Sequence, residues 1–192
     1  TRTPSSAASD VYKRQVIFGL GPAGTGKSYL AVAKAVQSLK KGHVDKIILS
    51  RPAVEAGENL GFLPGDMKDK VDPYLRPIYD ALYEMMPFET VEKKIQEGII
   101  EIAPVAFMRG RTFKNSFIII DEAQNTSSIQ MKMILTRLGY GSKMIINGDL
   151  TQIDIKYIND SGLSTAKKKL SNLKTIKFIN LNKKDVVRHK IV

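Results

Sequence analysis

A chain of 192 residues is long enough for one domain with a buried core. It contains no cysteine and only two histidines, His43 and His189, so disulfides and cysteine-ligated zinc are excluded and a histidine metal cluster is not expected. The formal net charge is +11, of which residues 167–192 contribute +8 and residues 16–166 only +1. A lysine-rich solvated surface explains this basic C-terminal end at least as well as an RNA-binding patch.

The two ends of the sequence lack the features expected at the boundaries of a domain. Residues 1–15 have no helical or strand period, and SSAASDVYKRQ resembles the in-frame translation of a transposon-type sequencing adaptor. We interpret 1–15 as such an artefact or as a disordered tail, and 16–192 as one domain truncated at both ends. No apolar run could span a bilayer and the start lacks a secretory signal, so we expect a soluble, cytoplasmic protein without membrane contact.

Strands and helices alternate from residue 16 onward. Continuous apolar, β-branched runs predict buried parallel strands at 16–20, 46–50, 117–120, 143–147 and 175–181, with a sixth strand, 99–104, near the sheet edge. Helical patterns occupy 27–39, 73–86, 89–97, 128–138 and 162–173, and Gly139 is expected to end the fourth of these helices. The alternation predicts an α/β fold with a doubly wound parallel sheet in three α/β/α layers.

The segment GPAGTGKS lies between the first strand and the first helix and matches G-x-x-x-x-G-K-[ST]. Its glycines allow backbone N–H groups to point at phosphate oxygens, and the helix N-terminus adds positive charge. Lys27 would reach the β- and γ-phosphates and Ser28 would ligate Mg²⁺. The alternative is a flexible turn with an exposed lysine. The predicted nucleotide-contacting residues are Gly21, Pro22, Ala23, Gly24, Thr25, Gly26, Lys27, Ser28 and Tyr29.

A second site motif, FIIIDEAQN, consists of the apolar strand at 117–120 and the mostly polar residues that follow it. Asp121 would join Ser28 in holding the magnesium, and the adjacent Glu122 could polarise a water molecule. A small-molecule kinase has no need of this second acid, so the pair favours hydrolysis. The alternative is a solvated strand end.

The next strand ends in NGDLTQID. A polar residue at the tip of a neighbouring strand can sense whether a γ-phosphate is present, and Gln152 is the candidate, with Asp149 forming the turn. The alternative is an ordinary Asn-Gly turn.

The sequence NKKD after the last strand matches the guanine-recognition pattern N-K-x-D through Asn182, Lys183 and Asp185. A GTPase would also need a glycine three residues after Asp121, where Gln124 stands, and no threonine-bearing switch loop is evident. GTP is therefore the less favoured ligand.

Together these residues resemble the PhoH-like family, the phosphate-starvation-inducible ATPases related to superfamily 1 helicases. The resemblance rests on GPAGTGKSYLAVAKAV, SRPAVEAGENLGFLPGD, EIAPVAFMRGRTF, FIIIDEAQNT, NGDLTQID and DVVRH, and covers nearly all of 16–192. It implies a RecA-like fold with the Gln152 strand between the Lys27 and Asp121 strands, and ATP rather than GTP. Ser28 stands where threonine is usual, a proline expected soon after Ile153-Asp154 is absent, and the expected adenine-contacting segment lies upstream of this chain.

Five arginines, Arg51, Arg109, Arg111, Arg137 and Arg188, lie in these family-like segments. Arg188 follows the last strand and could contact the γ-phosphate or a neighbouring subunit's site. Arg109 and Arg111 are alternatives for a finger offered to a neighbour or for a nucleic-acid phosphate contact.

The leading hypothesis is a Mg²⁺-dependent ATPase linked to RNA metabolism, with Lys27, Asp121, Glu122, Gln152 and Arg188 as catalytic residues. One RecA-like domain leaves ATP open on one side, so we expect a homo-oligomer, such as a ring. The alternatives are an ATP-gated module that recruits an RNA-processing protein with little turnover, and an RNA helicase active only as an oligomer.

Overall fold

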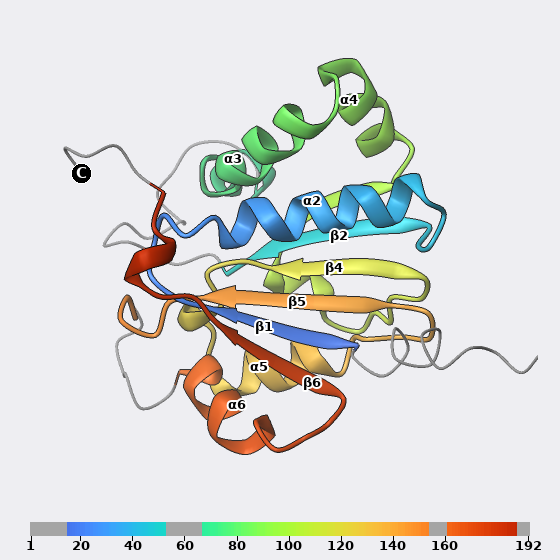
Figure 1. The fold of residues 1–192 in the computed structure, drawn as a ribbon. Helices are drawn as coiled ribbons and strands as arrows, with labels where there is room; N and C mark the ends of the chain where they lie inside the picture. The colour runs from blue at the N-terminus through green and yellow to red at the C-terminus, as the bar shows by residue number, and fades with distance from the viewer. Residues whose placement is uncertain (1–14, 53–66, 154–160, 188–192) are drawn as a thin grey trace, which may run out of the picture.

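A computed structural model describes residues 15–52, 67–153 and 161–187. Of residues 1–15, predicted to be an artefact or a tail, residues 1–14 lie outside these ranges. Six strands form one sheet in which every adjacent pair is parallel, in the order β3-β2-β4-β5-β1-β6 (Figure 1). The strands are β1 (Val16–Leu20), β2 (Lys46–Arg51), β3 (Ile100–Pro104), β4 (Ser116–Ile120), β5 (Lys143–Gly148) and β6 (Ile176–Asn180).

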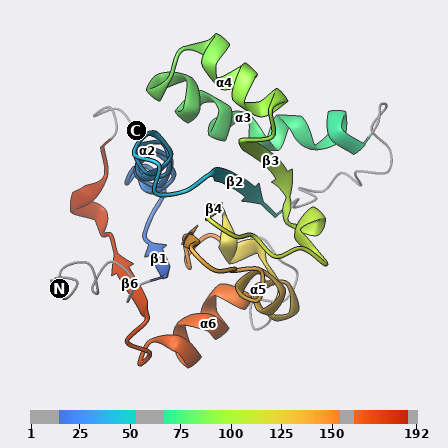
Figure 2. The same ribbon diagram turned by 90° about the vertical axis from the view of Figure 1, so that its right-hand side faces the viewer.

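Helices cover both faces of the sheet, as the alternation of elements predicted. The helices are α2 (Lys27–Lys40), α3 (Met67–Met85), α4 (Phe88–Gln96), α5 (Ser128–Leu135) and α6 (Gly162–Leu170). Figures 1 and 2 show α2, α3 and α4 on one face and α5 and α6 on the other. The fold is therefore the predicted three-layer α/β/α arrangement. None of the helices in the described ranges is long and apolar enough to cross a bilayer.

Strand β4 is the centre of the core because all five of its residues are buried. Phe117 and Ile119 pack into the cluster on the α2 side, whereas Ile118 and Ile120 pack into the cluster on the α5 and α6 side. This alternation is what period-two side chains produce in a sheet covered on both faces. Burial on both sides fixes the strand, and with it the position of the residues that follow Ile120.

The strand order places β5 between β1 and β4, as the family resemblance implied. Leu20 at the end of β1 lies opposite Gly148 at the end of β5, and Ile120 at the end of β4 lies opposite Ile146. Because all the strands are parallel, their carboxyl ends share one edge of the sheet, where ligands bind in folds of this class. The segments after β1, β4 and β5 therefore meet at that edge.

Three details of the sequence interpretation were wrong. The last strand, β6, is a largely exposed edge strand rather than a buried one, although its Phe178 stacks on Phe18 at 4.5 Å between ring centroids. Helix α3 begins at Met67, six residues before the expected start at Pro73. Pro73 therefore lies inside the helix, a position that proline disfavours because it lacks the amide donor and its ring crowds the preceding turn, and this is why the sequence pattern placed the start there.

The third detail concerns Gly139, which does not end helix α5. The helix ends at Leu135 with Thr136 as its C-cap residue. The Gly139 amide donates to the carbonyl of Phe113 at 2.8 Å, and a Cβ at this position would collide with that carbonyl. The glycine is therefore required by a close approach between two backbone segments and not by helix termination.

Candidate functional site

The loop between β1 and α2 is anchored on two sides. The Gly21 amide donates to the carbonyl of Gly148 at 3.2 Å, and the Val187 amide donates to the carbonyl of Gly24 at 3.0 Å. Gly24 and Gly26 have φ angles of 79° and 72°, a region in which residues with a Cβ are strained. Gly26 is the N-cap of α2 and supplies no side-chain acceptor, so no N-cap side chain occupies the first amides of the helix. The positive φ angles and the uncapped helix start are the features that the sequence predicts for a phosphate-binding loop.

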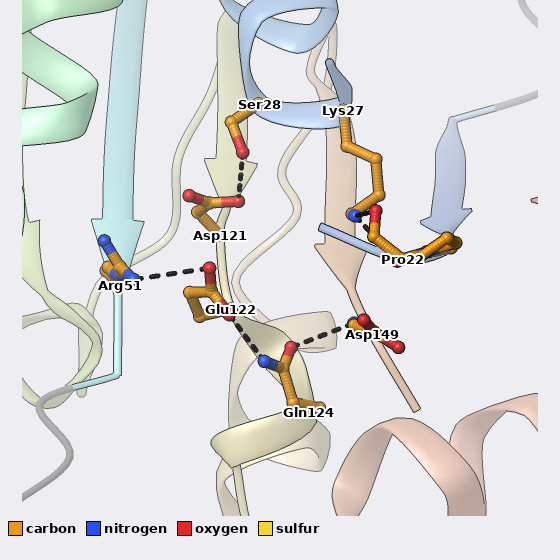
Figure 3. A network of polar contacts seen from close by, with 9 residues as sticks. Pro22, Lys27, Ser28, Arg51, Asp121, Glu122, Gln124 and Asp149 are labelled. Atoms are coloured by element: carbon orange, nitrogen blue, oxygen red, sulfur yellow. Dashed lines mark hydrogen bonds and ion pairs between the residues drawn. The ribbon is translucent and has the colours of Figure 1, made fainter. Parts of the chain in front are cut away.

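Lys27 is the first residue of α2, and its ammonium group folds back over the loop (Figure 3). Its Nζ donates to the carbonyls of Gly21 and Pro22 at 2.7 and 2.8 Å. Burial lowers the pKa of Lys27, and three carboxylates, those of Asp149, Glu122 and Asp121, act in the opposite direction. A phosphate could replace these carbonyls because an ammonium group is attracted more strongly to an anionic oxygen than to a neutral one.

Ser28 and Asp121 are in direct contact at the junction of α2 and β4. The Ser28 hydroxyl donates to Asp121 Oδ1 at 2.7 Å (Figure 3). Asp121 is only 4% exposed, and its burial, followed by the charge of Glu122, raises its pKa. The hydrogen bond from Ser28 and the charge of Arg51 partly oppose this rise. The structure thus brings together the two residues predicted to hold a magnesium ion.

Glu122 has an unusual backbone and a side chain held at both oxygens. Its φ of 51° makes it one of two described non-glycine residues with a positive φ, and such strain is typical of functional positions. Arg51 Nη2 lies 3.3 Å from Oε1, and the Gln124 side-chain amide donates to Oε2. With its side chain 36% exposed, the carboxylate also reaches solvent.

Asp149 forms the turn after β5, as predicted. Its Oδ1 accepts hydrogen bonds from the amide and the hydroxyl of Thr151 at 2.9 and 2.7 Å, while its Oδ2 is buried and has no hydrogen-bond partner within the described part of the chain. Asn147 and Gly148 are the last residues of β5, so the alternative of an Asn-Gly turn was wrong. Gln152 is exposed, and its predicted sensing role stays a prediction.

The residues of this strand-end edge enclose a cavity of about 250 Å³. Its lining combines the loop, the first turn of α2 and the ends of β4 and β5. The lining residues are Ala23, Gly24, Gly26, Lys27, Ser28, Tyr29, Asp121, Glu122, Gly148, Asp149 and Gln152. Most residues of the predicted site therefore share one cavity, whereas Gly21, Pro22 and Thr25 of the loop are not among its lining residues.

Two residues that contact Glu122 were not assigned there from the sequence. Gln124 was named from the sequence only as the residue that stands where a GTPase would need glycine. Arg51 was named among five arginines and was given no role. The DEAQ segment does show a polar residue two positions after Glu122. Spacing alone does not reveal that the chain turns back and buries Gln124, which is 1% exposed.

The arginines predicted as alternative fingers differ in their contacts and exposure. Arg111 makes two hydrogen bonds to the carboxylate of Glu101, lies 4.7 Å from the centroid of the Phe113 ring, and holds the pKa of Glu101 below its ordinary value. Arg111 therefore has a structural carboxylate partner within its own chain. Arg109 is exposed, and Arg188 lies outside the described residues.

The NKKD segment forms a local turn. The Asn182 amide donates to Asp185 Oδ2 at 2.8 Å, and Asn182 Oδ1 accepts from the Lys184 amide at 2.9 Å. These two contacts cap the 3₁₀ helix Lys183–Asp185. The side chains that would recognise guanine are thus engaged with their own backbone.

The parallel α/β sheet and the glycine-rich loop between β1 and α2 place the chain in the class of P-loop proteins. A model of the family described as "PhoH-like protein" matches residues 1–192. A PhoH-like protein from Bacillus subtilis (strain 168) is 60% identical over 180 residues, covering 94% of this chain and 56% of the relative. The chain belongs to the PhoH-like family, which confirms the resemblance drawn from its motifs.

Other relatives give the same family and show the extent of the match. A PhoH-like protein from Mycobacterium tuberculosis (strain ATCC 25618 / H37Rv) is 57% identical, covering 92% of this chain and 50% of the relative. Protein PhoH from Escherichia coli (strain K12) is 44% identical, covering 93% and 51%. The chain spans about half the length of these curated relatives.

Solved structures give a distant likeness. The Pif1 helicase from Candida albicans matches with a TM-score of 0.39 at 15% identity, covering 95% of this chain and 40% of that one. A second solved structure, that of an ATPase domain, matches with a TM-score of 0.37 at 15% identity, covering 80% and 66%. A likeness this distant supports no functional assignment.

The burial of Asp121 predicts an effect on stability. Because its pKa is raised in the folded state, ionised Asp121 costs stability at neutral pH, and this cost disappears as the pH falls toward the pKa of the unfolded chain, about 3.9. Asp121→Asn should therefore raise the Tm of the nucleotide-free, metal-free protein at pH 7 by about 2–4 °C, or about 1 kcal/mol. Differential scanning calorimetry at pH 7 and pH 4 measures this gain and its decrease in acid.

The exposed Asp45 provides the control. Asp45→Asn should leave the Tm unchanged at both values of pH. A lower Tm for Asp121→Asn at pH 7 would show that ionised Asp121 stabilises the unliganded fold.

Proposed function

We propose that this domain binds ATP with Mg²⁺ and hydrolyses it by in-line attack of water on the γ-phosphate. The observation that carries the proposal is the 2.7 Å contact between Ser28 and Asp121, beside the anion-binding loop and in the same cavity as Glu122. A hydroxyl at the start of the helix and a carboxylate at the end of a neighbouring strand are the protein groups that hold Mg²⁺ in P-loop ATPases.

The loop and Lys27 bind the phosphates in this proposal. The positive φ values of Gly24 and Gly26 shape the loop, and the uncapped start of α2 adds amide donors and positive potential. Lys27 exchanges the carbonyls of Gly21 and Pro22 for phosphate oxygens. Its positive charge then neutralises charge that develops on the β- and γ-phosphate oxygens.

The donor set suits magnesium. Asp121, Glu122 and Asp149 line the cavity. The nearby positive charges are those of Lys27, which also lines the cavity, and of Arg51, which pairs with Glu122. No group of three or more His, Cys, Asp or Glu residues in the described ranges could hold a metal ion alone. Mg²⁺ commonly takes one or two protein carboxylates together with substrate phosphates, which matches Ser28 and Asp121. When bound, the ion would supply positive charge that stabilises the negative charge of the phosphates.

Glu122 orients the attacking water. Its carboxylate is partly exposed and lines the cavity next to Asp121. Gln152, on the turn after β5, lines the same cavity and would report the presence of the γ-phosphate. ATP is preferred to GTP in this proposal, because Asn182 and Asp185 are held in a local turn.

The link to RNA rests on family membership and on surface charge. Five exposed lysines lie in the last turn of α6, in the segment before β6 and on β6 itself, and such basic residues suit an anionic polymer. They are Lys167, Lys168, Lys169, Lys174 and Lys177. RNA binding, and the recruitment of an RNA-processing protein, stay predictions.

A homo-oligomer, such as a ring, is part of the proposal. The cavity is lined by one domain, and catalysis calls for a further cation at the γ-phosphate. Arg188 and the exposed Arg109 are the candidates, whereas Arg111 is bound to Glu101 within the chain.

Two substitutions separate nucleotide binding from turnover. Lys27→Ala should weaken ATP binding by about 100-fold or more, because it removes a charged phosphate ligand. Glu122→Gln should leave binding intact and lower kcat by about 10²–10⁴-fold, the range of a positioned base. Titration with a fluorescent ATP analogue and a phosphate-release assay measure the two quantities.

The exposed Lys34, on the same helix as Lys27, is the matched control. Lys34→Ala should change neither binding nor turnover. Equal loss of binding in Lys27→Ala and Glu122→Gln would refute the division of roles.

Mixing subunits tests the shared site. Lys27→Ala subunits keep Arg188, and Arg188→Ala subunits keep an intact glycine-rich loop with Lys27. In an equimolar mixture the first can supply its arginine to the site of the second, so the mixture should regain turnover that neither variant has alone. The gain should be large because an arginine finger is worth about 10³–10⁵ in rate. Arg109→Ala subunits provide the second arm of the experiment.

A mixture of Lys27→Ala with Glu122→Gln subunits is the control and should stay inactive, since every site in it lacks one of its own residues. Specific activity should also rise with protein concentration. If activity per subunit stays constant down to concentrations at which light scattering shows only monomer, the shared site is ruled out.

A further inference from the structure

Gln124 connects the ends of two strands through the two atoms of its side-chain amide. Its Nε2 donates to Glu122 Oε2, and its Oε1 accepts a hydrogen bond from the backbone amide of Asp149 at 3.1 Å (Figure 3). Glu122 follows β4 and Asp149 follows β5. The amide therefore spans from the residue proposed to orient water to the turn that carries Gln152.

The polarity of this connection is fixed by its partners. A backbone N–H can only donate, so the Gln124 oxygen must face Asp149. A carboxylate can only accept, so the Gln124 nitrogen must face Glu122. Both requirements are met by one orientation of the amide, and aspartate or glutamate at this position would meet only the first. Glutamine is thus chemically specified at position 124.

The surroundings leave Gln124 little freedom. Its side chain is 1% exposed, and a Cβ built on Gly148 would lie 2.9 Å from Oε1 and 3.1 Å from the Gln124 backbone nitrogen. The Gln124 carbonyl accepts a hydrogen bond from the Ser161 hydroxyl at 3.1 Å, so its backbone is held as well. Because the buried amide is hydrogen-bonded through both its nitrogen and its oxygen, a movement of Asp149 would move the amide and, with it, the donor to Glu122.

We propose that Gln124 is a positioning residue for Glu122, and that it couples the orientation of this carboxylate to the turn after β5. The proposal rests on the ATP hydrolysis proposed above. Glu122 Oε1 is bound by Arg51 and Oε2 by Gln124. Without the Gln124 donor, the ion pair with Arg51 draws the carboxylate toward β2 and away from its place beside Asp121. A shift of the Asp149 amide when Gln152 meets a γ-phosphate would move Gln124, and Glu122 with it.

Gln124→Glu is the sharpest test because it preserves shape and the acceptor for Asp149 while replacing the donor with an oxygen that repels Glu122. In the full chain it should lower kcat for ATP by about 10-fold or more. The KM and the Kd for a fluorescent ATP analogue should stay within about 3-fold, since Gln124 does not line the cavity. Gln124→Met, which keeps the length but neither hydrogen bond, should show the same split.

Thr126→Val is the matched control, because it removes a buried hydrogen bond of the same segment, from the Thr126 hydroxyl to the Ala123 carbonyl at 2.7 Å, without touching Glu122. It should leave kcat unchanged. In a Glu122→Gln background, Gln124→Glu should cause no further loss of rate, because positioning matters only for the carboxylate.

The outcomes separate this proposal from the one on which it rests. A wild-type chain that binds ATP without turnover overturns the proposed hydrolysis and the positioning role together. If the wild-type chain turns over ATP and both Gln124 variants keep its kcat, the positioning role alone is overturned. The same follows if Gln124→Glu lowers kcat by the same factor in the Glu122→Gln background as in the wild-type background. Loss of the folded state in both variants, seen by near-ultraviolet circular dichroism, would assign Gln124 a structural role instead.

Discussion

The hydrogen bond from the Ser28 hydroxyl to the Asp121 carboxylate joins two parts of the chain that are 93 residues apart in sequence. It holds the start of α2 against the end of the buried strand β4. The glycine-rich loop lies on one side of this contact, and Glu122 lies on the other. The parallel sheet makes the contact available, because it brings the ends of β1, β5 and β4 to one edge.

The site is held at a cost in stability. Asp121 is almost fully buried with a raised pKa, Asp149 has a buried oxygen without a hydrogen-bond partner in the described ranges, and Glu122 has a left-handed backbone. Each of these features opposes folding in the absence of ligand. Lys27 and Arg51 offset part of the negative charge, and a bound cation would offset more. Such local conflicts within an otherwise consistent α/β domain are expected at functional sites.

Much of the fold and of the site could be predicted from the sequence. A continuous apolar run located β4 because all five of its residues are buried. The G-x-x-x-x-G-K-[ST] spacing and the Asp-Glu pair after β4 predicted which segments meet at the edge of the sheet. The exposure of β6 could not be predicted, since an apolar run does not reveal that a strand lies at an edge. Gly139 was assigned to a helix end because spacing gives no sign of a backbone contact with Phe113.

The contacts of Gln124 and Arg51 with Glu122 depend on tertiary geometry. Glu122 turns back through a positive φ, and only this turn directs the Gln124 amide at both Glu122 and Asp149. The pairing of Arg111 with Glu101 likewise joins residues on β3 and on the segment before β4. Motif spacing predicted most of the residues that line the cavity, and it did not predict the contacts of Gln124 and Arg51 with Glu122.

Calorimetric titration of ATP into the full chain, with and without Mg²⁺, tests the role of the Ser28–Asp121 contact most directly. The account predicts that Mg²⁺ strengthens ATP binding to the wild-type protein, and that Ser28→Ala abolishes this effect while magnesium-free binding persists. ATP affinity that is independent of Mg²⁺ in the wild type, or an undiminished Mg²⁺ effect in Ser28→Ala, would contradict it.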